Sequence, residues 1–202
     1  MPRVIAWKLY GLYLCLSSCN EWITIYWNDI NLNCKEESEE AFMAKEKIAK
    51  TNAARLLDRD KIKYELVPYE VDENDLSCVH VAATLGENIE QVFKTLVMFG
   101  EKSGHFVCVV PGENEIDLKM AAKVSGNKKC DLIPMKELLP LTGYIRGGCS
   151  PIGMKKHFPT YIHKTCMEFE YIYISAGVRG LQIKIAPADL IKVARAEVCE
   201  LF

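Results

Sequence analysis

The sequence lacks the cysteine and histidine spacings that hold metal ions or disulfide frameworks. It contains nine cysteines and four histidines, but no C-x-x-C pair, and no histidine stands at a metal-ligand spacing from a cysteine. An odd number of scattered cysteines fits a reducing compartment better than a disulfide framework. We therefore expect neither a bound metal nor another cofactor.

The common motifs of nucleotide binding and of serine hydrolases are also missing. Neither G-x-G-x-x-G nor the P-loop pattern occurs, and no serine stands in a G-x-S-x-G elbow. Cys149 lies eight residues before His157 and could be a thiolate nucleophile, but no third group is evident to orient the histidine. A small apolar filler is the favoured interpretation of Cys149.

Charge of neither sign predominates. The formal net charge is −2, and residues 43–202 carry 22 basic and 21 acidic side chains once the three basic and six acidic residues of 1–42 are set aside. A protein that coats nucleic acid is far more basic. Any nucleic acid must therefore be contacted through a local patch.

The sequence has no uninterrupted apolar run long enough to span a bilayer. Lys8 breaks the stretch before Cys19, although Leu16 to Cys19 is similar to a lipoprotein signal. Residues 1–42 also hold all three tryptophans and an acidic segment. We favour an N-terminal extension at 1–42 and one functional, cytoplasmic domain at 43–202 without a membrane partner; a lipoprotein is the alternative.

Apolar periodicity predicts one domain of mixed architecture. Helices are expected at 45–59, 77–85, 116–124 and 187–195, with a helical turn at 135–139. Strands are expected at 62–69, 92–99, 105–110, 129–133, 160–163, 171–175 and 181–185. Because both hairpins and helices join the strands, we expect an α/β (mixed α+β) fold, a curved, barrel-like mixed β-sheet surrounded by helices.

The segment from Thr142 to Thr160 cannot continue a regular helix or strand, since its nineteen residues include four glycines and two prolines. Glycine permits a left-handed backbone and close approach of a ligand, and proline fixes φ. A rigid loop with exposed N–H groups would suit an anion or a carbonyl oxygen. A surface turn with solvated lysines fits the composition equally well.

Lys94 stands in an otherwise apolar strand, where an unpaired ammonium is costly to bury. It either reaches a ligand or extends to water, and the residues alone favour neither. Tyr69, at the end of the first strand, could face the same cavity or pack as an ordinary aromatic. Arg179, in the turn from Ser175 to Gly180, could meet a phosphate, although a plain hairpin explains that turn better.

Together these segments resemble the YbaK family of free-standing aminoacyl-tRNA deacylases, relatives of the editing domain of prolyl-tRNA synthetase. The resemblance rests on 92–96, on the long glycine run from Thr142 to Lys156 and on 175–180, with smaller matches at 69–70 and 117–119. It covers residues 45 to about 200 in the same order and does not extend to 1–42.

The resemblance implies hydrolysis of mischarged tRNA(Pro), most typically Cys-tRNA(Pro), with prolyl-tRNA synthetase as a possible partner. It makes Lys94 the essential lysine at the aminoacyl-adenosine end, and places Gly147 and Gly148 N–H groups near the ester. The substrate-binding set it implies is Tyr69, Gly147, Gly148, Ser150, Pro151, Gly153, Ser175 and Gly177, and the expected tRNA contacts are Lys155, Lys156 and Arg179. An activated ester can be cleaved by orientation and oxyanion stabilisation alone, and a cysteinyl substrate could attack with its own thiol.

Several positions depart from the family pattern. Ala176 and Val178 replace a frequent glycine and lysine, Gln182 replaces a frequent acidic residue, and no aromatic lies near Leu76. These changes affect the pocket, so cysteine and alanine both remain open as the amino acid removed. A non-catalytic module that binds tRNA or a synthetase is the alternative from another functional class.

Overall fold

The computed structural model describes residues 49–202. The expected extension at 1–42 and the lipoprotein-like segment lie outside the described residues. Among the described helices, none combines the length and the apolar character that a bilayer span requires.

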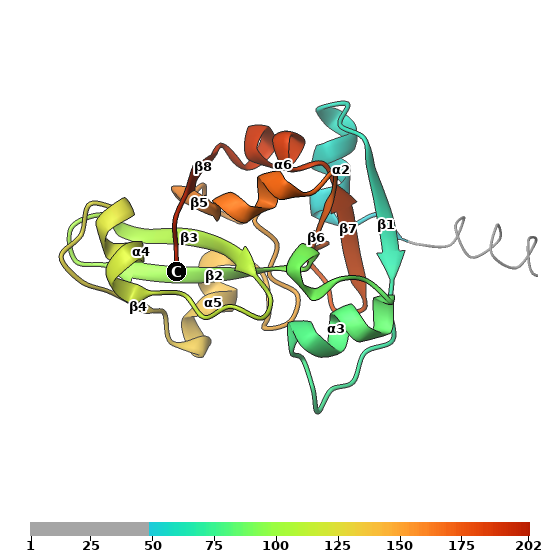
Figure 1. Cartoon of the computed structure of the whole chain (residues 1–202), viewed down its shortest axis with the longest axis horizontal. Helices are drawn as coiled ribbons and strands as arrows, with labels where there is room; N and C mark the ends of the chain where they lie inside the picture. Colours follow the sequence, from blue (N-terminus) through green and yellow to red (C-terminus); the bar gives the residue numbers. More distant parts are fainter. Residues whose placement is uncertain (1–48) are drawn as a thin grey trace, which may run out of the picture. The chain divides into compact units, whose positions relative to one another are not determined.

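The strands form two separate sheets (Figure 1). The smaller sheet has the order β1-β7-β6, and all its pairs are antiparallel: β1 (Tyr64–Pro68), β7 (Leu181–Ile185) and β6 (Ile172–Ser175). The larger sheet has the order β4-β2-β3-β5-β8: β4 (Cys130–Leu132), β2 (Phe93–Gly100), β3 (Gly104–Pro111), β5 (Thr160–His163) and β8 (Ala196–Cys199). β5 is parallel to both β3 and β8, whereas β2 is antiparallel to its two neighbours.

The expected barrel is wrong, because neither sheet closes on itself. A single β-bridge, from Val92 to Tyr173, joins strands of the two sheets. The outer strand β1 ends at Pro68, which has no N–H to donate to a further strand. The single mixed α/β domain is confirmed, but its strands form two open sheets.

Five helices connect the strands in the described part of the chain: α2 (Asn52–Arg59), α3 (Cys78–Leu85), α4 (Leu118–Val124), α5 (Met135–Thr142) and α6 (Pro187–Ala194). Two 3₁₀ turns, η1 (Ile89–Gln91) and η2 (Lys164–Glu168), complete the order. The helix expected from 45 begins only at Asn52, because the side chain of Thr51 accepts the Ala54 N–H and ends the preceding extended segment. Ser77 and Asp117 cap α3 and α4 in the same way.

One hydrophobic cluster of the core lies between the β2–β3 hairpin and α4. Met98, Phe106 and Cys108 are fully buried there, and Ala121 from α4 packs against them. Leu201, just after β8, is buried in the same cluster, and its carbonyl accepts the Asp117 N–H at 2.8 Å. The C-terminal segment is therefore built into the hydrophobic core.

Candidate active site

The first cavity, of about 540 Å³, lies where the two sheets meet. β4 pairs with β2 only from Met98 to Gly100, so the edge of β2 from Phe93 to Val97 faces this cavity instead of another strand. β6 and β7 contribute Ser175 and Gln182 from the other sheet. The volume is in the range of small-molecule sites.

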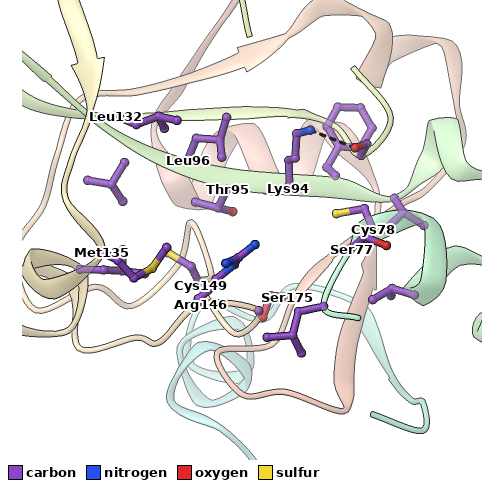
Figure 2. Close-up of a pocket in the computed structure, with 18 of the residues that line it drawn as sticks. Ser77, Cys78, Lys94, Thr95, Leu96, Leu132, Met135, Arg146, Cys149 and Ser175 are labelled. Atoms are coloured by element: carbon purple, nitrogen blue, oxygen red, sulfur yellow. Dashed lines mark hydrogen bonds between the residues drawn. The ribbon is translucent and has the colours of Figure 1, made fainter. Parts of the chain in front are cut away.

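Lys94 enters the cavity from β2 and is half-buried. Its Nζ donates a hydrogen bond to the Gly112 carbonyl oxygen at 3.0 Å, drawn as the dashed line in Figure 2. An ammonium has three donors, so two remain for a ligand. The structure thus brings the lysine singled out from the sequence into a cavity and holds it there.

Two polar atoms of the cavity lining have no hydrogen-bond partner. Thr95 Oγ1 and Gln182 Oε1 are both buried, and no group within residues 49–202 bonds to either of them. Gln182 is only 5% exposed, so burying its amide oxygen without a hydrogen bond costs desolvation free energy, and a bound donor would offset that cost. Buried polar atoms without partners are rare in native proteins, and both of these atoms belong to residues that line the cavity.

The charge of the lining is positive. Lys94 and Arg146 are cationic, and none of the lining residues within 49–202 is an aspartate, glutamate or histidine. Figure 2 shows the Arg146 side chain extending from its loop toward Thr95 on β2. Ser77 and Cys78, at the N-terminus of α3, add the positive end of a helix dipole. The site therefore suits a substrate that develops negative charge.

The thiols of the cavity are protonated near neutral pH. Burial raises the pKa of Cys149 to about 12. Burial also raises the pKa of Cys78, although nearby Lys94 opposes that shift. Cys149 lines the first cavity, whereas His157 lines the second cavity described below. The alternative of a Cys149–His157 nucleophile is not supported.

The glycine-rich segment presents only part of the expected backbone donors. Gly147 lines the cavity with a left-handed φ of 80°, and its N–H has no acceptor within residues 49–202. The Gly148 N–H is already donated to the Ile145 carbonyl oxygen at 3.0 Å. Gly148 packs tightly against the Val178 and Arg179 backbone, since an added Cβ would come within 3.2 Å of it. Its role is close packing, and the free donor belongs to Gly147.

The remaining residues of the segment shape the loop. Ser150 is fully buried, and its Oγ accepts the Ile152 N–H at 3.3 Å. The hydroxyl of Tyr144 donates to the Ile152 carbonyl oxygen at 2.7 Å, and Asn52 Nδ2 donates to Gly153 at 3.1 Å. Pro151 and Gly153 line the second cavity instead of the first. The loop is held from both α2 and its own interior.

Ser175 and Gly177 are neighbours with different environments. Ser175 lines the first cavity, and its Oγ accepts the Gly177 N–H at 3.2 Å. Gly177 has a φ of 97° and does not line the cavity; an added Cβ would lie 2.8 Å from Cε1 of Tyr144. Tyr69 does not line the cavity either, and packs against the cluster of Val81, Ala82, Val92 and Tyr173.

The three expected tRNA contacts differ in the partners that they have within the protein. Lys155 Nζ donates to the Leu139 carbonyl oxygen at 3.4 Å. Arg179 donates to the Arg146 carbonyl oxygen at 2.9 Å and forms an ion pair with Glu73. Lys156 alone lines the second cavity. Exposed Lys156 is the one free cation of the three within the described chain.

Sequence reasoning missed Ser77, Cys78, Thr95 and the apolar rim formed by Leu132 and Met135. Thr95 follows Lys94 directly, but successive strand residues point to opposite faces, so adjacency alone does not predict a shared cavity. The missing signal was the short length of β4, which leaves the edge of β2 open.

The chain is similar to proteins that are already known. A family model described as an aminoacyl-tRNA editing domain matches residues 72–193, more than half of the chain. A curated relative from Enterococcus faecalis (strain ATCC 700802 / V583) is 46% identical over 160 residues, which is 79% of this chain and 98% of the relative. That protein, EbsC, is provisionally named a Cys-tRNA(Pro)/Cys-tRNA(Cys) deacylase.

Solved structures show the same fold. A provisionally assigned trans-editing enzyme for prolyl tRNA synthetase is 23% identical with a TM-score of 0.65, over 76% of this chain and 98% of that one. The hypothetical protein APE2540 is 18% identical with a TM-score of 0.69, over 75% of this chain and 99% of that one. At these identities the likeness concerns the fold alone.

Proposed function

The chain belongs to the aminoacyl-tRNA editing family, the YbaK-type deacylases, and on this premise we propose that it removes cysteine from mischarged tRNA(Pro) in trans. The substrate meets the protein in the cytoplasm, with prolyl-tRNA synthetase as the enzyme that supplies it. The observation that carries the proposal is the first cavity, whose lining has two cations, a free backbone N–H and no acidic or histidine side chain.

Lys94 and Gly147 are assigned to the reacting ester. Lys94 keeps two ammonium donors after its bond to Gly112, and the Gly147 N–H has no other acceptor within 49–202. Both would stabilise the oxyanion that forms when the ester carbonyl is attacked, as preorganised donors do in acyl transfer. Arg146 is assigned to the anionic RNA at the mouth of the cavity.

Thr95 and Gln182 are assigned to the amino acid. The α-ammonium group of an aminoacyl ester carries donors, and Gln182 Oε1 is a buried acceptor without a partner. Thr95 Oγ1 can give or accept the second bond. Both atoms gain a hydrogen-bond partner only when substrate is bound. These hydrogen bonds orient the ester toward Lys94. Ser175, whose hydroxyl shapes the adjoining turn, completes this wall.

The nucleophile is assigned to the substrate itself. The lining offers no general base, and the pKa of the Cys149 thiol is about 12, so no protein group is ready to attack. The cysteinyl thiol instead adds to its own ester carbon and passes its proton to the departing 3′-oxygen as the C–O bond breaks. The product is a cyclic thioester that water opens to cysteine. The name of the Enterococcus relative supports cysteine as the amino acid.

The test compares three aminoacyl forms of one tRNA. Cys-tRNA(Pro), Ser-tRNA(Pro) and Ala-tRNA(Pro) are offered to the wild type and to Lys94→Met, and Cys-tRNA(Cys) is the fourth substrate. We expect cysteine to be released at least about a hundredfold faster than serine, because a hydroxyl is a far weaker nucleophile than a thiol. Lys94→Met should abolish release.

Equal rates for cysteine and serine would exclude attack by the substrate thiol. Rapid release of alanine would replace the cysteine proposal by the broader deacylase. If no substrate were hydrolysed while tRNA still bound, the chain would be a binding module. Lys102→Met, at an exposed turn outside both cavities, is the matched lysine control.

A further inference from the structure

A second cavity, of about 480 Å³, lies apart from the reacting ester's site. Its lining comes from the end of α2, from residues 151–158 and from the last turn of α6. No residue lines both this cavity and the first. The assignments made above use none of its side chains.

The lining of the second cavity concentrates positive charge. It carries four cationic side chains, Arg59, Lys156, Lys192 and Arg195, against the single carboxylate of Asp60, a formal charge of +3 with His157 neutral. The Asp60 carboxylate is already bonded to Arg59 at 3.0 Å. Residues 43–202 as a whole are close to neutral, so this concentration is local.

Three of these cations are available to a ligand. Lys156, Lys192 and Arg195 are exposed, and none forms a salt bridge within residues 49–202. The carboxylates that flank them along the chain, Asp189 and Glu197, do not line the cavity. These three exposed cations outnumber the single carboxylate of Asp60, which is itself bonded to Arg59, so the lining suits an anion and gives binding that salt weakens.

The two cavities are joined by one short stretch of backbone. Gly147 and Cys149 line the first cavity, and Pro151 begins the lining of the second. Four residues span at most about 14 Å of chain, and a nucleic-acid strand carries a phosphate about every 3.4 Å along a helix. At this point of the chain the two linings are therefore separated by no more than the length of about four phosphates of one strand.

We propose that the second cavity binds phosphodiester groups of the tRNA acceptor strand, a few nucleotides from the acylated end. This inference rests on the proposed function, which supplies tRNA as the ligand. It adds a site that holds the RNA without touching the ester. The lining contains one aromatic ring, the buried Phe158, besides the His157 imidazole. It offers little for base stacking, so contact is to the backbone and independent of base sequence.

The test uses the double variant Lys192→Gln/Arg195→Asn in the full chain. Asparagine tolerates the left-handed φ of 50° at position 195, so the charge is removed without new backbone strain. Lys128→Gln/Lys129→Gln removes two exposed lysines outside both cavities and is the matched control. Binding of uncharged tRNA(Pro) is followed by fluorescence anisotropy from 50 to 300 mM KCl.

Loss of two phosphate contacts to a single strand should change the salt dependence of binding. The slope of the logarithm of the association constant against the logarithm of the salt concentration should become shallower by about 1.4. At about 0.15 M salt this corresponds to roughly tenfold weaker binding for the cavity variant, with the control variant close to wild type. Hydrolysis of the cysteinyl ester of adenosine, which carries no phosphate, should be the same in all three proteins.

An unchanged salt slope in the cavity variant would overturn the proposal, as would equal losses in the two double variants. Impaired hydrolysis of the adenosine ester would also overturn it, because the second cavity would then act on the chemistry. Competition with inorganic pyrophosphate separates a small ligand from RNA: if pyrophosphate bound the cavity without displacing tRNA, the RNA assignment would fail. The anisotropy result does not depend on deacylation, so failure of the proposed function remains distinguishable.

Discussion

Lys94 has one hydrogen bond, to Gly112, and a side chain that is only half-buried. Its ammonium is therefore not needed to satisfy a deeply buried partner. Lys94→Met keeps the length of the side chain and removes the charge. We expect the free energy of unfolding to change by no more than about 3 kcal/mol, the upper end of the range for a single hydrogen bond to a charged group.

Deacylation by Lys94→Met should in contrast fall by at least about a hundredfold, as when one oxyanion donor is removed. Urea unfolding and single-turnover deacylation separate the two effects. A variant that lost activity only in proportion to its stability would assign Lys94 to the fold.

Thr95 and Thr142 can both be replaced by valine, but only the hydroxyl of Thr142 has hydrogen-bond partners within the described residues. Thr95 Oγ1 has no partner, whereas Thr142 Oγ1 donates to Leu138 at 2.7 Å and accepts the Tyr144 N–H at 3.0 Å. Thr95→Val should leave stability unchanged or raise it, because an unsatisfied hydroxyl is removed from a strand. Thr142→Val should cost about 1–3 kcal/mol, because it leaves a donor unpaired.

The activity of Thr95→Val tests whether the Thr95 hydroxyl binds the substrate. We expect kcat/KM for Cys-tRNA(Pro) to fall by about fivefold to tenfold, the value of one lost hydrogen bond in the bound state. If Thr95→Val were as destabilising as Thr142→Val, its hydroxyl would have an internal partner and no substrate role. Thermal unfolding and steady-state kinetics on the same preparations give both answers.

At the scale of elements, the turn between β6 and β7 depends on a close approach. Gly177 combines a φ of 97° with a space in which Cβ would lie 2.8 Å from Tyr144 Cε1. Gly126 has a φ of 70° and open space around its Cα. Gly126→Ala should cost about 1–2 kcal/mol for its backbone conformation alone. Gly177→Ala should cost distinctly more, by urea unfolding.

The added cost at Gly177 arises because the Tyr144 ring must move, and its hydroxyl holds the Ile152 carbonyl oxygen. Deacylation should therefore fall as well in Gly177→Ala, since the glycine-rich loop shifts. Equal losses of stability in the two alanine variants would mean that the turn adjusts without disturbing Tyr144.

Local sequence signals predicted most of these elements. Alternation predicted β2, β3, β5 and β7, and the caps at Ser77 and Gly86 bounded α3 as expected. Alternation does not reveal which strand pairs with which, so the two open sheets were taken for one barrel. No strand was expected at β8, because it directly follows the helix that ends at Ala194, with only Arg195 between them.

The candidate site was predictable only where a residue was chemically unusual. Lys94 conflicted with its apolar strand, which left a ligand and the solvent as alternatives, and the structure places its side chain in the lining of a cavity. Tyr69 did not conflict with its surroundings, and in the structure it packs against a hydrophobic cluster outside the cavity lining. The Gly148 N–H depended on a contact within the loop, to Ile145, which composition cannot show.

At the scale of the whole molecule, the buried thiols make stability sensitive to alkaline pH. Burial raises the pKa of Cys149 to about 12 and that of Cys166 to about 11, above the usual value near 8.5. Between these values the unfolded chain loses protons that the folded chain keeps. The free energy of unfolding should therefore be fully retained below about pH 8.5 and fall as pH rises toward 11.

Each such thiol contributes a slope of up to about 1.4 kcal/mol per pH unit in that interval. Urea unfolding under reducing conditions at pH 7, 9 and 10 measures it. Cys166→Ala should show a shallower decline than the wild type, because one of the shifted groups is gone. A stability that did not change between pH 8 and 10 would contradict the burial of these thiols.

The burial of Leu201 and the pairing of β1 with β7 also have a consequence during synthesis on the ribosome. β1 ends at Pro68, and its partner β7 ends at Ile185. A ribosome that adds about 5–20 residues per second leaves β1 without its partner for roughly ten seconds. The larger sheet remains incomplete for longer, because β8 and Leu201 are synthesised after β7. The nascent chain therefore exposes unpaired strand edges until β8 and Leu201 have emerged, and chaperones can bind these edges during that time.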